Sequence, residues 1–441
     1  MKQRFVLVIC LFACFIGANA AVWETMFSYN KVNQIAVTRD KVYAVSDGAL
    51  FSVEKYSERL EKYDAGSGLH GTTIGCIGYA KELDMLIIGY EDGKIDLLKD
   101  NNVTYVSGLY TKDMMATKNI HNITIRDNFA YLSTDFGIVT FNLNKYELVD
   151  TYFIGNEASE VKVNDILFRG DTIFAFTDDW LYKANTSDNI VDYRFWSKEP
   201  LGRVQQDTNK GKIVTDSNGE RWEAGGTDGI IRITIAQKKL TYKPDGPLVN
   251  TPYCMRTFNG RLYVVPGGRW GVQYLTPGCV MVFDGQKWHN ISQATIRSAT
   301  GNNPATDFMD VAVDPNDPEH FFVTAYGGGV YEFQNYQPQK QYLPSNSSLV
   351  TRVDNAPTKY TRCTGGAFDS KGNYWCLNTS ESKTVHRFTP NKQWYGITLT
   401  KDGNVVPIYT TAEILLDKRN ENHKWIVSCR EGTKLLLLDD N

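Results

Sequence analysis

The sequence has no long run of charge of either sign and few cysteines, and after its first twenty residues it has no long apolar run. The 47 basic and 50 acidic residues nearly cancel, for a formal net charge of −3. This balance gives no support to a nucleic-acid groove or a polybasic membrane surface. No later segment is apolar over the roughly 20 residues that a spanning helix needs. We therefore expect a mature chain that is soluble or held by a partner, with no transmembrane segment and no nucleic-acid partner.

The N-terminus is the exception. Lys2 and Arg4 precede an apolar stretch over residues 5–16, and Gly17-Ala-Asn-Ala20 follows it. This pattern is typical of a secretory signal peptide, so residues 1–20 are predicted to be removed by cleavage after Ala20. A membrane anchor is less favoured because the stretch is too short to span a bilayer. A lipoprotein signal ending at Cys14 is also disfavoured, because a bulky residue stands two positions before it.

Six cysteines remain after the signal peptide. An even number in an exported protein permits disulfides. Each of them lies in a strand-like segment and none forms a Cys-x-x-Cys pair, which favours mostly buried free thiols. Cys363 with Cys376, on either side of one turn, is the pair to test first for a disulfide. The six are Cys76, Cys254, Cys279, Cys363, Cys376 and Cys429.

One phrase recurs along the chain: a two-residue turn, an aromatic-rich strand, a polar corner that usually ends in Gly, and a second apolar strand. Its first two copies lie at residues 39–51 and 84–98. The corner returns at a period of roughly 43 to 55 residues, which is typical of propellers and solenoids. The nine corners are Gly48, Gly93, Gly137, Trp180, Gly229, Gly278, Gly329, Lys383 and Gly432.

Each copy alternates aromatic or β-branched residues with polar ones, which is the periodicity of a strand. The turns between the strands suit tight hairpins. Helical patterns are scarce, and the best of them, residues 56–63, is short and highly charged. Four strands in about 40 to 50 residues are the content of one propeller blade. The sequence therefore predicts an all-β fold of four-stranded blades, forming one β-propeller region and part of a second.

The spacing of the corners also suggests where the domains divide. It lengthens after the fourth copy, where residues 238–252 are rich in Pro and Lys. We place a boundary near residue 248, with an N-terminal propeller region of about five blades at 21–248 and a second region, incomplete at its C-terminal end, at 249–441. A second candidate boundary lies at 337–348. Nine units exceed one ring and fall short of two, so we expect a fragment whose first ring needs blades from sequence absent here.

Two copies contain a phrase that resembles a catalytic motif. Asp216-Ser-Asn-Gly-Glu-Arg-Trp222 and Asp369-Ser-Lys-Gly-Asn-Tyr-Trp375 share one frame. Their Gly stands three residues after the Asp, whereas a sialidase Asp-box has it two residues after. A tight turn that leads a Trp into the next strand is the favoured interpretation. Residues 327–329, all Gly, lack the Lys and helix of a phosphate loop, which favours a blade corner.

Other candidate chemistry is sparse. Asp178-Asp179 and the pair Asp314 with Asp317 are carboxylates in turns, where capping or solvation is favoured, because glycosidase acids must converge across a pocket. The histidines are isolated and show no metal-ligand spacing. Most of the 25 Tyr, 21 Phe and 9 Trp are expected in the core, with a few as platforms for glycans or peptides. No catalytic, cofactor or metal site is predicted, no cofactor is expected, and ligand-binding residues stay unassigned. The histidines are His70, His121, His289, His320, His386 and His423.

Several phrases are similar to one known family. Three of them resemble the N-terminal propeller of the PorZ family, components of the type IX secretion system of Bacteroidota, and three more resemble the second propeller of that family. The phrase at 369–375 is also similar to blades of two-component-regulator propellers. The first three lie at residues 86–98, 130–141 and 149–155, and the others at 313–323, 327–333 and 346–349.

The resemblance implies two propellers and a small C-terminal β-sandwich, which this sequence lacks, in a complex that attaches secreted cargo to the cell surface. It also implies association with a sortase of the PorU type and binding of anionic lipopolysaccharide. Our leading hypothesis is a non-enzymatic scaffold at the outer membrane, the cell surface or in the periplasm, binding through loops on a rigid support. The alternatives are the extracytoplasmic ligand sensor of a hybrid two-component system and a secreted glycan-active enzyme.

Overall fold

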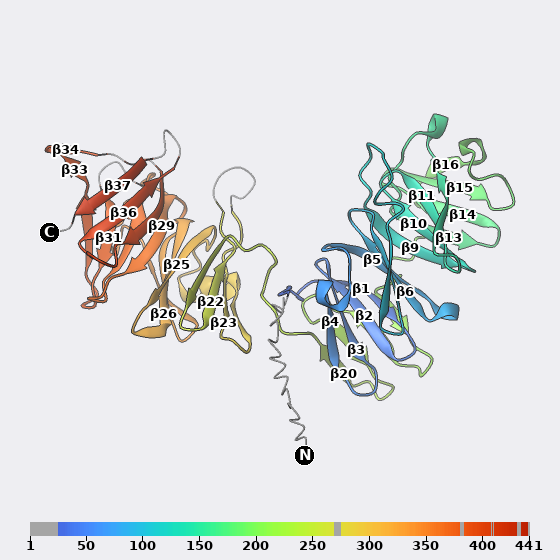
Figure 1. Cartoon of the computed structure of the whole chain (residues 1–441), viewed down its shortest axis with the longest axis horizontal. Helices are drawn as coiled ribbons and strands as arrows, with labels where there is room; N and C mark the ends of the chain where they lie inside the picture. The colour runs from blue at the N-terminus through green and yellow to red at the C-terminus, as the bar shows by residue number, and fades with distance from the viewer. Residues whose placement is uncertain are drawn as a thin grey trace, which may run out of the picture.

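The computed structural model describes residues 25–268, 275–379, 383–406, 408, 410–429 and 434–439. The predicted signal peptide at 1–20 lies outside these ranges. Figure 1 shows the described strands in two groups, one coloured blue to green and the other yellow to red. No helix within the described ranges is long and apolar enough to cross a membrane.

Five four-stranded antiparallel sheets form the N-terminal group, each with its strands side by side in chain order. The first two sheets are β1 (Val32–Val37), β2 (Lys41–Ser46), β3 (Ala49–Glu54) and β4 (Leu60–Tyr63), then β5 (Ile74–Ala80), β6 (Met85–Tyr90), β7 (Ile95–Lys99) and β8 (Asn102–Val106). The other three are β9 (Ile120–Arg126), β10 (Phe129–Thr134), β11 (Gly137–Asn142) and β12 (Glu147–Tyr152), then β13 (Asp165–Arg169), β14 (Thr172–Phe176), β15 (Trp180–Asn185) and β16 (Ser197–Pro200), then β17 (Ile213–Thr215), β18 (Arg221–Ala224), β19 (Ile230–Ile233) and β20 (Lys239–Tyr242).

Four further strand groups form the C-terminal part, and the second and third of them are joined through β26 and β29. The first two are β21 (Cys254–Phe258), β22 (Arg261–Val265), β23 (Val280–Phe283) and β24 (Trp288–Ile291), then β25 (Phe308–Asp314), β26 (Asp317–Gly327), β27 (Gly329–Gln334) and β28 (Gln337–Tyr342). The last two are β29 (Thr361–Phe368), β30 (Tyr374–Asn378), β31 (Lys383–Phe388) and β32 (Trp394–Thr398), then β35 (Thr411–Leu416), β36 (His423–Ser428) and β37 (Lys434–Asp439). The remaining elements are the hairpin β33 (Thr400–Lys401) with β34 (Asn404–Val405), the helices α1 (Gln293–Ala299) and α2 (Pro357–Tyr360), and the short 3-10 turns η1 (Ala65–Ser67), η2 (Lys81–Leu83), η3 (Asn156–Ala158) and η4 (Tyr193–Phe195).

These strand groups confirm the fold class and the nine predicted copies. Every described corner lies between the second and third strands of one group or is the first residue of the third strand, and Gly432 itself lies outside the described residues. Glycine is required at some corners for a physical reason. Gly329 has a φ of 74°, in the left-handed region that favours glycine, and a Cβ there would lie 2.2 Å from the Tyr342 carbonyl oxygen.

Three local features add to or differ from what the sequence suggests. Residues 56–63, the best helical candidate of the sequence, form a turn followed by β4, whose Tyr63 is buried, because packing of this side chain overrides the charged local pattern. The helix α1 was not predicted, although Ser292 caps it by accepting a hydrogen bond from the Thr295 amide at 3.2 Å. The candidate boundary at 337–348 begins on β28, where Pro338 is tolerated because this strand lies at an outer edge and pairs through a register shift.

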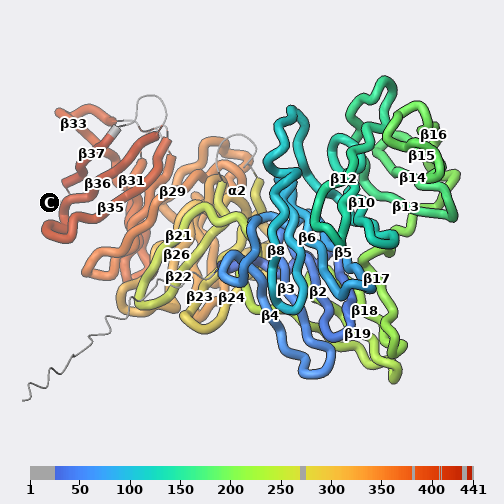
Figure 2. The backbone as a smooth tube through the Cα atoms, turned by 45° about the vertical axis from the view of Figure 1, so that its right-hand side comes forward, coloured from blue at the N-terminus to red at the C-terminus, as the bar shows by residue number. Residues whose placement is uncertain are grey.

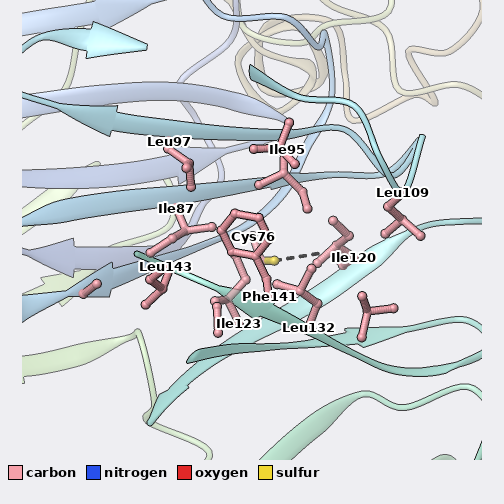
Figure 3. Close-up of a cluster of buried hydrophobic side chains, with 14 of the residues drawn as sticks. Cys76, Ile87, Ile95, Leu97, Leu109, Ile120, Ile123, Leu132, Phe141 and Leu143 are labelled. Carbon is pink, nitrogen blue, oxygen red and sulfur yellow. Dashed lines mark hydrogen bonds between the residues drawn. The ribbon is translucent and has the colours of Figure 1, made fainter. Parts of the chain in front are cut away.

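The N-terminal sheets stack face to face, with apolar side chains between them. Figure 3 shows the cluster between β5–β8 and β9–β12, in which Cys76, Ile87 and Phe141 meet side chains such as Ile120. The Cys76 thiol donates a hydrogen bond to the Ile120 carbonyl at 3.4 Å. Burial of a large apolar side chain such as Ile87 or Phe141 contributes roughly 1.5–3 kcal/mol to the stability of the fold. The many buried side chains between the sheets therefore hold the stack together as a firm support.

The fifth sheet, β17–β20, packs against the first. Trp222 and Ile230 share one apolar cluster with Phe51 of β3, and the Val32 amide donates to the Gly226 carbonyl at 3.0 Å. Figure 2 shows β17–β19 beside β2 and β3. The spatial order is therefore β17–β20, β1–β4, β5–β8, β9–β12 and β13–β16. Completion of this ring by further blades stays a prediction.

The predicted boundary near residue 248 falls in an extended segment that is held from two sides. The Ser28 hydroxyl donates to the Leu248 carbonyl at 2.8 Å, and the Ser28 amide donates to Asn250 Oδ1 at 2.6 Å. On the other side, the Trp288 amide donates to Asp245 Oδ2 at 2.9 Å. The segment thus links the N-terminal residues to β24, and the domain assignment itself stays a prediction.

The six described cysteines are free thiols, and four of them are buried, as predicted. Burial raises the pKa of the Cys279 and Cys376 thiols to about 12. Cys363 and Cys376 lie on the adjacent strands β29 and β30, and neither forms a disulfide.

Candidate functional site

The first strand of several sheets carries a β-bulge close to the strand that begins the next sheet. In β1 the register shifts between Val32 and Gln34. The Gln34 side chain then donates to the Ile77 carbonyl and accepts from the Ile77 amide, each at 2.9 Å. A bulge re-aims a side chain in this way because the extra residue bends the strand. The Gln34 amide therefore joins two sheets that share no backbone ladder.

An acid occupies the equivalent place at the start of β13. Asp165 accepts hydrogen bonds from Asn122 Nδ2 at 2.7 Å and from its neighbour's amide at 2.8 Å, and Lys210 Nζ lies 2.6 Å from it. Lys210 also donates to Thr124 Oγ1 at 2.6 Å. The adjacent Gly211 accepts a hydrogen bond from the Ile35 amide at 2.6 Å. The segment before β17 thus crosses from one side of the sheet stack to the other, fastened by a nearly buried ion pair.

The C-terminal group has a similar polar centre. Arg256 of β21 makes a bidentate pair with Asp310 of β25, at 2.9 and 3.1 Å, and reaches Glu413 of β35 at 3.1 Å. The Gly366 amide of β29 donates to Asp310 at 3.1 Å. Burial lowers the pKa of Arg256, but Asp310 more than offsets this effect and the pKa is raised. One arginine therefore connects three strands from different sheets.

Polar hollows lie over the turns between first and second strands. Two adjacent hollows, with cavities of about 490 and 210 Å³, lie over the turns that follow β1, β5 and β17. A third, of about 400 Å³, lies beside Arg126 and Lys210. A fourth, of about 410 Å³, lies beside His320 in the C-terminal group. These hollows are the candidate ligand sites of the described chain.

The fourth hollow contains an imidazole between two carboxylates. His320 Nδ1 lies 2.9 Å from Asp314 Oδ2, and its Nε2 lies 3.2 Å from Glu332 Oε1. The hydrogen bond to Glu332 raises the pKa of His320, burial opposes this, and the bond to Asp314 raises it further. The Tyr342 hydroxyl donates to Glu332 at 2.7 Å. Both acids are thus engaged by their neighbours.

The treatment of the histidines as isolated was wrong for four of the six. Besides His320, three others lie beside an aspartate that is 5 to 26 residues away in the chain. Only the shortest separation, across one hairpin, was recognisable in the sequence. No group of three or more His, Cys, Asp or Glu side chains in the described ranges is placed to hold a metal ion. The pairs are His70 with Asp96 at 2.9 Å, His121 with Asp135 at 2.6 Å, and His289 with Asp284 at 2.7 Å.

The carboxylates predicted to cap turns do so. Asp314 accepts from the Asn316 amide at 2.9 Å, and Asp317 accepts from the Glu319 amide at 3.0 Å. Exposed Asp178 accepts from a neighbouring asparagine at 2.7 Å, and Asp179 is also exposed. The three glycines at 327–329 form the corner between β26 and β27, as expected.

Comparison with known proteins gives a family match for part of the chain. Residues 42–197 match the family described as the N-terminal β-propeller domain of PorZ of the type IX secretion system. Among solved structures, PorZ of Porphyromonas gingivalis, described as an essential bacterial surface component of that system, superposes with a TM-score of 0.78 at 22% identity. The match covers 94% of this chain and 65% of that one. This chain thus spans 65% of the length of the PorZ structure.

A second solved structure, the extracellular domain of the proposed one-component system BT4673 of B. thetaiotaomicron, is 14% identical. The match covers 92% of this chain and 53% of that chain, with a TM-score of only 0.32. No curated protein matches the sequence. The predicted resemblance is nevertheless confirmed: the chain has a PorZ-like fold of four-stranded β-propeller blades, and residues 42–197 match the PorZ N-terminal propeller domain.

Proposed function

We propose that this protein is a non-enzymatic component of a type IX secretion attachment complex, exported by its signal peptide and working at the outer membrane or cell surface. The match of residues 42–197 to the PorZ N-terminal propeller domain carries the proposal. The likeness of the fold over 94% of the chain supports it.

In this role the protein binds anionic lipopolysaccharide and a sortase of the PorU type. Loops and turns on a rigid scaffold are the usual place for such binding. The buried apolar clusters between the sheets supply the rigidity, and the hollows over the turns supply concave polar surface. A hollow and a buried apolar cluster thus occur together in each of the two groups of sheets.

The arrangement of the acids supports a binding role rather than catalysis. Glycoside hydrolysis needs two carboxyl groups free to act on either side of one bond. Asp165 and Asp310 are held by Lys210 and Arg256, respectively, and Glu332 accepts from a tyrosine while it contacts His320. These three acids are therefore committed to structural partners.

The experiment is affinity purification of the tagged full-length protein from detergent-solubilised outer membranes. We expect a PorU-type sortase and anionic lipopolysaccharide to co-purify. The same procedure with an untagged strain controls for material that sticks to the resin. A preparation that contains neither component contradicts the proposal, and a screen for glycan sensing then becomes the next step.

A further inference from the structure

Two of the hollows form one groove across three neighbouring sheets. The larger, about 490 Å³, is lined by the turns after β1, β5 and β17, and the smaller, about 210 Å³, lies between β1–β4 and β5–β8. Both are lined by Thr38, Arg39, Tyr79 and Asp84. We call this surface the turn groove. Its larger part falls within the usual range for small-molecule sites, about 300–1,000 Å³.

The wall that the two hollows share contains a charged pair, Arg39 with Asp84, and an aromatic residue, Tyr79. Arg39 Nη2 lies 3.0 Å from Asp84 Oδ2, and the Tyr79 hydroxyl donates to Asp84 Oδ1 at 2.6 Å. The Arg39 side chain is 74% exposed. Such an exposed pair contributes little to stability, so a ligand can replace it at little cost. Tyr79 is half-buried, packs in part against the core and lines both hollows.

Charges of both signs line the turn groove. At the floor of the larger hollow, Lys55 and Asp216 pair at 3.4 Å with side chains only 7% and 2% exposed. At its rim, Lys81 stands beside Glu82, and in the smaller hollow Asp100 adds a further acid. The basic groups are thus matched by acids, and no excess positive charge remains for a polyanion.

This combination suits hydroxyl groups better than phosphates. Arginine supplies several donors, a carboxylate supplies several acceptors, and a sugar hydroxyl can use both. An aromatic ring supplies an apolar surface for the carbon face of a sugar. A phosphate-rich ligand would instead favour several unpaired arginines or lysines.

We propose that the turn groove binds an uncharged stretch of an oligosaccharide chain. Its hydroxyls bond to Arg39 and Asp84, and one sugar ring lies on Tyr79. The inference rests on the proposed function for the source of the chain, since the sugars then belong to the lipopolysaccharide. It adds that the anionic groups of this ligand do not contribute to binding at the turn groove.

The test is titration calorimetry of the full-length protein with lipid-free polysaccharide from the lipopolysaccharide of its source bacterium. One sample keeps its phosphates, and a second has them removed with hydrofluoric acid. We expect similar affinity for both samples and little change between low and high salt. Arg39→Ala and Tyr79→Ala each weaken binding about tenfold or more.

Arg194→Ala is the matched control within the same group of sheets. Arg194 pairs with Asp192 and its side chain is 74% exposed, as that of Arg39 is, but it lines none of the four hollows. The variant should bind as the unchanged protein does.

Hydroxyl-radical footprinting of the unchanged protein gives a readout independent of any variant's folding: the polysaccharide should protect Tyr79 but not Tyr56, which is 80% exposed.

Three results overturn the inference: no binding of either sample, binding of the phosphorylated sample alone, or equal losses in the Arg39 and Arg194 variants. If the sortase still co-purifies in these cases, the proposed function stands and only the sugar site fails. If the turn groove binds the dephosphorylated sample but no sortase is recovered, the site stands and the attachment-complex role fails.

Discussion

The indole Nε1 of Trp375 donates a hydrogen bond to Asp369 Oδ2 at 2.8 Å, across one tight turn. Trp222 makes the same bond to Asp216 at 3.1 Å in a sheet 153 residues earlier in the chain. Gly372 lies in the turn with a φ of 77°, in the left-handed region that favours glycine. The repeated phrase therefore fastens a buried tryptophan to the turn before its strand, and the structural interpretation of it is confirmed.

Asp369→Ala tests this turn. The substitution leaves the Trp375 indole and the Asn373 side chain and amide without the acceptor that they share. Buried donors without an acceptor cost about 1–3 kcal/mol each, so we expect the free energy of unfolding to fall by about 2–4 kcal/mol. Urea denaturation measures this. Asp113→Ala, at an exposed loop position, should change it by less than about 0.5 kcal/mol, and an equal loss in both variants would refute the role of the turn.

The strands and corners could be predicted because they depend on neighbouring residues. The alternation of side chains defines a strand, and a glycine such as Gly329 marks a corner whose backbone needs a positive φ. The polar contacts that join different sheets have no such local signal. Lys210 and Asp165 are 45 residues apart, and Arg256 and Glu413 are 157 apart, so only the stacking of the sheets brings them together.

The candidate site was equally hidden. Arg39 and Asp84 each belong to a recognisable turn, but their contact across 45 residues follows from the packing of two sheets. Tyr79 looks like any aromatic residue of a strand until its hydroxyl is placed on Asp84. A repeat of this kind therefore predicts which turns exist, whereas the twist and order of the sheets decide which turns meet.

Lys55→Met tests the ion pair beneath the turn groove. Burial raises the pKa of Asp216. Hydrogen bonds from Trp222 and from backbone amides, together with the charge of Lys55, lower it by more, so the net effect is a lowered pKa. Removal of the lysine leaves a buried carboxylate without its cation, which costs about 3–5 kcal/mol. Chemical denaturation measures the loss.

Lys31→Met is the control for this change. Lys31 pairs with Asp47 at 3.8 Å, and its side chain is 75% exposed. Exposed pairs of this kind contribute about 0–1 kcal/mol. Similar losses in the Lys31 and Lys55 variants would mean that the buried pair has no special part in holding β1–β4 to β17–β20.

His386 should make the fold sensitive to acid. Burial lowers its pKa to about 4, and its Nδ1 lies 2.8 Å from the Ser348 hydroxyl. The unfolded chain, with an ordinary histidine pKa of about 6.5, binds the proton first. Stability is therefore complete above pH 6.5 and falls as the pH drops toward 4, by up to about 3 kcal/mol. His386→Gln should flatten this slope in denaturation curves between pH 7.5 and 4.5, whereas His423→Gln, on β36, should keep it.

His320 should act in the opposite sense. Its pKa is raised, first by the hydrogen bond to Glu332, against the effect of burial, and then by Asp314. A raised pKa in the folded state gives stability that is complete below the unfolded value and is lost as the pH rises through the folded value. In His320→Gln the free energy of unfolding should thus fall more at pH 5.5 than at pH 9. An equal loss at both pH values would show that the charge of the imidazole does not contribute.

The pair of Arg256 with Asp310 should show strong energetic coupling, which a double-mutant cycle measures. The Asp310 side chain is only 6% exposed and receives two bonds from the guanidinium. With Arg256→Ala, Asp310→Ala and the double variant, we expect a coupling of about 2 kcal/mol or more, because each single change leaves the other group without its main partner.

The exposed pair of Arg419 with Asp417 is the comparison. Its arginine is 92% exposed, and the atoms are 3.6 Å apart, so its cycle should give about 0.2–1 kcal/mol. A coupling at Arg256 no larger than this would mean that the sheets of the C-terminal group are held by their apolar faces alone. A larger value means that the arginine braces β21 to β25. Since Arg256 also reaches Glu413 of β35, Glu413→Ala should then lower the stability of the unchanged protein but not that of the Arg256→Ala variant.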